Sequence, residues 1–138
     1  MRNISALSLG LLCLGLGLYA AAAVTPLAYP AAFDADGSTR NAVALFVMLT
    51  ITAVTAAFGG WITARIVSDH RLGHALMTAT LGLVAAVLMS AVRWDAAPSW
   101  YWVTSWMLLP AAAAAGAAAW ERTLRRKNRD VSRRVAAT

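Results

Sequence analysis

Two histidines and one aspartate share a single short hairpin and are the residues of this chain best suited to metal chemistry. His70 and His74 are four positions apart, so on a helix they would lie on one face. A persuasive zinc site needs a third protein ligand. Asp69 is the only nearby candidate, and neighbours in sequence seldom share a ligand geometry. The sequence therefore predicts no metal, with a solvated or headgroup-facing histidine pair favoured over a pH sensor.

The other reactive groups are equally isolated. Asp34 and Asp36 lie in a polar stretch without a third ligand, which favours a solvated loop over a cation site. Cys13 is the single cysteine and can form no intramolecular disulfide. The apolar segments offer hydroxyls and one thiol but no base, whereas catalysis needs placed acids, bases or nucleophiles. We expect neither an enzyme nor a cofactor.

The elements that must position any functional side chains are four long apolar stretches, at about residues 4–29, 42–66, 72–92 and 99–120. Each meets the ~20 residues that cross a hydrocarbon core ~30 Å thick. A soluble four-helix bundle would instead show a polar face on every helix. The sequence predicts an all-α membrane protein whose four transmembrane helices form an antiparallel up-down bundle. Residues 1–120 would form this bundle, and residues 121–138 a basic cytoplasmic tail.

The basic residues are distributed unequally across this threading. With both termini inside, ten Lys and Arg residues lie in the cytoplasm and only Arg40 and Arg93 lie outside. The positive-inside rule favours this orientation. Cleavage of the first segment as a secretory signal is an alternative, because Arg2 precedes an apolar run that ends in small residues.

The tail carries seven of the twelve basic residues. Basic residues beside a spanning helix attract anionic phospholipid headgroups. Nucleic acid is not expected, because no stacking aromatics accompany the charge. Glu121 and Arg125 can continue the last helix for a turn or two with an i,i+4 pair. The predicted headgroup contacts are Arg122, Arg125, Arg126, Lys127 and Arg129.

Small and hydroxylated residues suggest how the helices pack. Glycines let membrane helices approach closely, and the predicted packing positions are Gly10, Gly17, Gly59, Gly60, Gly82 and Gly116. Thr52 and Thr55 share a face of the second segment. Their hydroxyls are expected to bond to their own helix or to a neighbour, with a polar lining as the alternative. Pro26 and Pro30 are expected to close the first helix.

The outer hairpin between the third and fourth segments is rich in aromatic residues. Trp94, Trp100 and Tyr101 predict an aromatic belt at the membrane interface. Asp95 can cap the fourth helix or pair with Arg93.

The stretch from Gly59 to Pro110 resembles a family of small four-helix bacterial inner-membrane proteins to which no activity is assigned. The resemblance implies the topology and a bacterial inner-membrane setting. It rests on Gly59–Gly60, Ala64, His74–Ala75, Gly82, Trp94–Asp95, Pro98, Trp100–Tyr101 and Leu109–Pro110.

Two functions agree with these features. The first is a non-catalytic module that assists or regulates a membrane partner, as the small-residue faces and the basic tail suggest. The alternative is a small oligomeric transporter or channel for a small solute, with Thr52 and Thr55 facing its path. The expected partners are the lipid bilayer, anionic headgroups, and either a further membrane protein or copies of the same chain.

Overall fold

A computed structural model describes residues 2–136, without the side chains of residues 2–4, 130, 131 and 134–136. Four long helices make up most of the described chain: α1 Arg2–Ala28, α2 Ala42–Ile66, α3 Arg71–Val92 and α4 Ser99–Ala136. Two short 3-10 helices, η1 Pro30–Ala32 and η2 Trp94–Ala96, lie in the connections. All four long helices are long and apolar enough to cross a membrane, and residues 2–136 contain no strand. The predicted fold class is confirmed.

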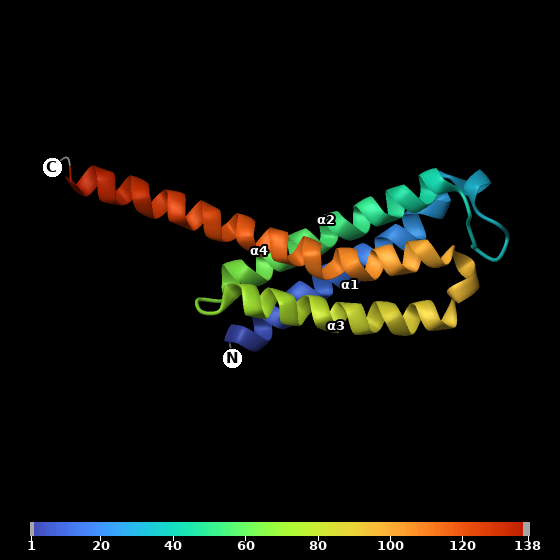
Figure 1. Cartoon of the computed structure of the whole chain (residues 1–138), viewed down its shortest axis with the longest axis horizontal. Coiled ribbons are helices and arrows are strands. Elements are labelled where there is room, and N and C mark those ends of the chain that lie inside the picture. The colour runs from blue at the N-terminus through green and yellow to red at the C-terminus, as the bar shows by residue number, and fades with distance from the viewer. Residues whose placement is uncertain (1, 137–138) are drawn as a thin grey trace.

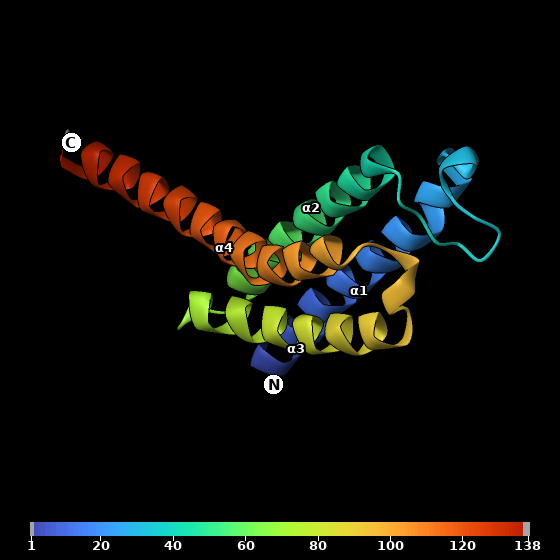
Figure 2. The same ribbon diagram turned by 45° about the vertical axis from the view of Figure 1, so that its right-hand side comes forward.

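The helices run up and down side by side, with α2 in the most extensive contact with α1 and α4 (Figure 1). One end of the bundle holds the α1–α2 and α3–α4 connections with Asp34, Asp36 and Asp95, and we call it the acidic end. The other holds the α2–α3 turn with Arg65 and Arg71, and we call it the basic end. α1 and α3 lie close at the basic end and separate toward the acidic end (Figure 2).

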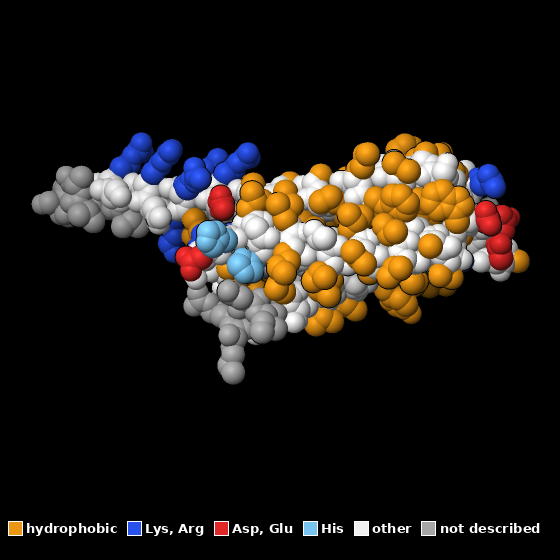
Figure 3. Space-filling model, turned by 60° about the horizontal axis from the view of Figure 1, so that its bottom comes forward, with side chains coloured by type: hydrophobic (Ala, Val, Ile, Leu, Met, Phe, Trp, Pro, Cys, Tyr) orange, Lys and Arg blue, Asp and Glu red, His pale blue; other side chains and the backbone are white. Residues whose placement is uncertain are grey.

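Small residues form much of the interior of the bundle beside a few buried larger ones such as Leu45 and Leu109, and many of the large apolar side chains point outward. Ala64, Ala75 and Ala117 are completely buried where α2, α3 and α4 meet. Phe46 and Leu88, by contrast, are exposed, and apolar side chains cover the surface between the two charged ends (Figure 3). An apolar surface this extensive is unusual for a soluble monomer. It is the surface expected of a bundle whose solvent is lipid.

The sequence predicts that Pro26 and Pro30 close the first helix, but the helix continues past Pro26. α1 passes through Pro26 and ends at Ala28, and Pro30 then opens η1. Proline removes one backbone donor, and transmembrane helices tolerate that loss. The chain retains a helical bond after the proline, since the Tyr29 amide donates to the Thr25 carbonyl at 2.9 Å.

The fourth helix is much longer than the predicted span with one or two added turns. α4 has 38 residues, which corresponds to roughly 57 Å at the α-helical rise and to nearly twice the hydrocarbon thickness. After Gly116 the helix meets neither glycine nor proline, and leucine, arginine, lysine and alanine are strong helix formers. Arg125 and Glu121 form the expected i,i+4 pair at 4.0 Å.

Asn41 caps the N-terminus of α2. Its side-chain oxygen accepts hydrogen bonds from the amides of Val43 at 3.0 Å and Ala44 at 3.3 Å. Asn41→Ala removes both bonds and is expected to lower stability by about 1 kcal/mol. Thermal unfolding in maltoside micelles measures the loss. Asn41→Asp keeps the acceptor and should unfold close to the wild-type temperature; equal losses for both variants would contradict the capping role.

Candidate functional site

Glycines lie where α2 and α4 approach most closely. A Cβ built on Gly116 would collide with the backbone carbonyl of Ala57, and one on Gly60 would collide with that of Ala113. Each helix therefore presents a glycine to the other's backbone. This geometry places two of the predicted packing glycines at the α2–α4 contact and fixes the distance between these helices.

The remaining predicted glycines lie where α1 meets its neighbours. Gly10 faces the Thr63 side chain, and the carbonyl of Gly10 lies 3.1 Å from the position of a Cβ on Gly59. Gly17 lies against Thr55, and Gly82 of α3 lies against Leu14. Gly15 of α1, which is not one of the predicted packing positions, has no atom of another element within 4 Å of a Cβ position.

The threonine face of α2 has no unused hydroxyls. Thr52 donates to the Met48 carbonyl and Thr55 to the Ile51 carbonyl, both at 2.8 Å. Thr52 is buried and borders a cavity, whereas Thr55 packs against Gly17. The structure therefore separates the two residues that the sequence grouped as a lining.

The aromatic hairpin lies at the acidic end and has both exposed and buried members. Trp94 and Trp100 are exposed, while Tyr101 is buried against Leu45 and Leu49. The predicted alternatives for Asp95 are both wrong: it does not cap α4, and within the described residues it forms no ion pair with Arg93. Asp95 instead lies in the first turn of η2, before α4 begins.

The histidine hairpin forms no metal centre within the described residues, where no three histidine, cysteine or acidic side chains gather. His70 adopts a left-handed backbone conformation at φ 48° and precedes α3. The His74 ring nitrogen Nδ1 lies 3.1 Å from the His70 carbonyl.

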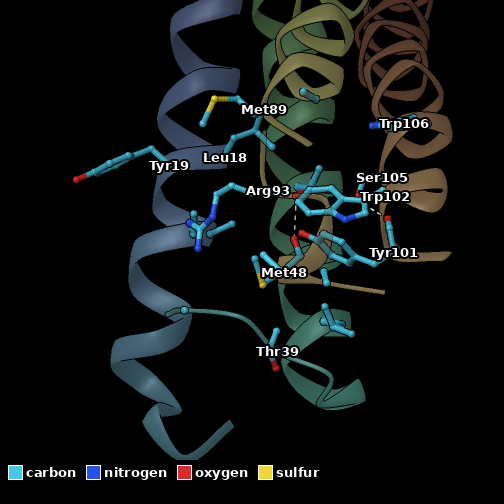
Figure 4. Close-up of a pocket in the computed structure, with 18 of the residues that line it drawn as sticks. Leu18, Tyr19, Thr39, Met48, Met89, Arg93, Tyr101, Trp102, Ser105 and Trp106 are labelled. Atoms are coloured by element: carbon cyan, nitrogen blue, oxygen red, sulfur yellow. Dashed lines mark hydrogen bonds between the residues drawn. The ribbon is translucent and has the colours of Figure 1, made fainter. Parts of the chain in front are cut away.

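A cavity of about 410 Å³ lies in the half of the bundle next to the acidic end. It occupies the space where α1 and α3 separate, and all four long helices contribute to its wall (Figure 4). Small residues of α1 and α3 leave this space open, and longer apolar side chains complete the wall. These wall residues include Gly15, Ala22, Ala85, Ala86, Leu18, Met48, Met89 and Leu109.

Two side chains that line this cavity have N–H donors without a hydrogen-bond acceptor among the described residues. Arg93 extends toward α1 and donates one hydrogen bond, from Nη2 to the Asp36 carbonyl at 3.1 Å (Figure 4). The indole nitrogen of Trp106 is buried and has no hydrogen-bond partner. The sequence patterns assign neither residue to a site. The sequence feature that could have indicated a cavity here is the pair of small residues Ala85–Ala86, on a helix that packs beside the aromatic residues of α4.

At the basic end, a cationic and aromatic cluster joins α2 to α4. The Arg65 guanidinium lies over the Trp61 ring, 5.3 Å from its centroid, and over the Trp120 ring at 5.7 Å. The two indoles meet edge to face at 5.6 Å. Such cation–π contacts strengthen where water is scarce. The cluster fixes α4 at the point where it leaves the bundle.

No family model, curated protein or solved structure matches this chain.

Proposed function

We propose that this protein is a non-catalytic module that assists or regulates a membrane partner. Its setting would be a bacterial inner membrane, with both termini in the cytoplasm. One observation carries the proposal: α4 runs without interruption from the bundle through residues 121–136. This segment, the basic arm, extends roughly 24 Å beyond the last tryptophan. Figure 1 shows it projecting away from the other three helices.

The basic arm displays its cations along a continuous surface. Arg122, Arg126, Arg129 and Arg133 are spaced by four, three and four residues, and they therefore lie on one face of the helix. All four side chains are exposed, as are those of Arg125 and Lys127 (Figure 3). Cations near an anionic membrane surface contribute about 1 kcal/mol each. The arm suits anionic phospholipid headgroups at its base and an acidic protein surface farther out.

The arm is attached rigidly to the bundle. Trp120 packs against Trp61 and Arg65 immediately before the arm begins. Because no glycine or proline follows this anchor, movement of α4 within the membrane would be transmitted along the helix. A rigid lever of this kind suits a module that reports to, or positions, a neighbouring protein.

The transport alternative receives less support from the geometry. The cavity is confined to one half of the bundle, and the pocket around Gly10 and Gly59 in the other half has a volume of only about 10 Å³. That is at the lower limit for one water molecule. The threonine hydroxyls are bonded to their own helix. A path through one protomer would have to open by a large rearrangement, so transport would require an interface between protomers.

Site-specific photocrosslinking in native membranes tests the proposal. A benzoylphenylalanine at Lys127, on the exposed arm, is expected to give one discrete protein adduct. The same probe at Phe46, which is exposed on the apolar surface, is the matched control and should react chiefly with lipid. Changing Arg122, Arg126 and Arg129 to glutamine should then remove the Lys127 adduct. Adducts with bulk membrane proteins only, or with further copies of this chain only, would contradict a dedicated partner.

A further inference from the structure

We infer that the cavity between α1 and α3 binds one acyl chain of an anionic phospholipid, whose phosphate contacts Arg93 and one of whose oxygens accepts from Trp106. This binding site goes beyond the proposed partner function and does not depend on the basic arm, which lies at the opposite end of the bundle.

The shape of the cavity suits a chain that enters from the bilayer. Its volume of about 410 Å³ lies within the usual range of ligand pockets. Tyr19 and Met89 border it, yet they are 73% and 65% exposed. The cavity therefore reaches the lipid-facing surface between α1 and α3. A partner helix is a poor occupant, because a helix about 10 Å wide would fill this volume with a single turn.

The unpartnered indole identifies where the ligand must be polar. The nitrogen of Trp106 is a donor only, and a buried donor without an acceptor is costly inside a membrane. Two hydroxyls that border the cavity already have acceptors. Thr52 donates to the Met48 carbonyl and Ser105 to the Tyr101 carbonyl, both at 2.8 Å. Figure 4 shows the indole nitrogen on the side of α4 that faces the cavity. A lipid ester or phosphate oxygen would supply the missing acceptor.

The free donors of Arg93 at the mouth favour an anionic headgroup. Arg93 has five N–H donors, of which the Asp36 carbonyl accepts one, and it forms no ion pair within the described residues. The Asp36 carboxylate lies close enough to attract Arg93, but it accepts from the Ser38 amide at 2.9 Å and, among the described side chains, forms no ion pair with the guanidinium. The fixed planar donors of a guanidinium match phosphate oxygens. A zwitterionic lipid would offer the same chain but a weaker net attraction.

Nuclear magnetic resonance of the tryptophan indoles tests the inference on the full chain. The ¹⁵N-labelled protein in maltoside micelles is titrated with lysophosphatidylglycerol, and the Trp106 signal is assigned with Trp106→Phe. We expect a saturable downfield shift of the Trp106 indole proton as it gains an acceptor. Lysophosphatidylcholine keeps the phosphate but adds a quaternary ammonium beside it, which offsets the attraction to Arg93, so it should bind about tenfold more weakly.

Two variants and a control separate the headgroup from the chain. Arg93→Gln should abolish the preference for the anionic lipid. Arg40→Gln, which removes an exposed arginine at the same end that does not border the cavity, should preserve it. Ala85→Phe, at an exposed position on the wall, should block the shift with either lipid. An equal response to both lipids, an unmoved Trp106 signal, or an effect of Arg40→Gln equal to that of Arg93→Gln would each overturn the inference.

Discussion

Replacing Gly116 by alanine is expected to destabilise the bundle by about 1–3 kcal/mol, the usual cost of overpacking a tight interior. The added methyl group would collide with the backbone carbonyl of Ala57. A side chain in that place could rotate away, but a helix backbone cannot. α4 must therefore move outward from α2, which breaks the most extensive contact of the fold. The loss would exceed the gain, up to about 1 kcal/mol, that alanine brings to a helix interior.

Gly15→Ala is the matched control for this prediction. Gly15 lies in the interior of α1, where a Cβ would meet no atom of another element within 4 Å. The same substitution there brings only the helix-propensity gain and should leave stability unchanged or slightly raised. Thermal unfolding of both variants in maltoside micelles, followed by circular dichroism, distinguishes the two effects. Equal midpoints for Gly116→Ala and Gly15→Ala would refute close packing as the role of Gly116.

The difference between these two glycines indicates what a sequence can predict about this fold. Small residues recur in α1 at steps of three and four, and this stripe predicts a packing face from helical periodicity alone: Ala6, Gly10, Cys13, Gly17 and Ala21. Gly15 lies off that stripe and indeed meets no neighbouring helix, whereas Gly10 and Gly17 lie on it and contact α2. The number of helices can also be predicted from the sequence, because the hydrocarbon thickness sets a minimum length for each span.

The cavity could not be predicted in the same way. Periodicity assigns residues to faces, but it does not give the angle at which two helices diverge. Because of that divergence, Arg93 and Trp106, thirteen positions apart in the sequence, line the same cavity. In the sequence, Arg93 is only one of two basic residues outside and a possible partner of Asp95, and Trp106 belongs to no motif. Only the spatial arrangement indicates that the Trp106 indole has no acceptor.

The predicted length of α4 is too short for a different reason. The change from apolar to charged residues after Trp120 marks the expected membrane boundary, and it predicts a helix that ends within one or two turns of that boundary. A polar, strongly helix-forming segment can continue a helix into water once the membrane-embedded part has nucleated it. The boundary of the membrane and the end of the helix are therefore separate features of this chain.

The proposed orientation predicts an all-or-none result in reporter fusions. Green fluorescent protein fused after Thr138 should fluoresce, because it folds in the cytoplasm, and alkaline phosphatase fused there should be inactive. Phosphatase inserted at Gly37, in the connection at the acidic end, should be active because that end would face the periplasm. The cause is the bias of ten basic residues against two. Cleavage of the first segment would leave these locations unchanged but would shorten the chain, which mass spectrometry of the purified protein detects.

A charge-shift variant tests whether the arginines themselves cause this orientation. Changing Arg122, Arg125, Arg126, Lys127 and Arg129 to glutamine lowers the cytoplasmic excess from ten against two to five against two. A bias remains, so the fusion at residue 138 should stay cytoplasmic. Adding three lysines to the connection at the acidic end of this variant makes the two sides equal, and a mixed population should then appear. The same three lysines in the wild-type chain leave ten against five and should have no effect. Inversion of that control would show that basic charge in the arm does not hold the chain in place.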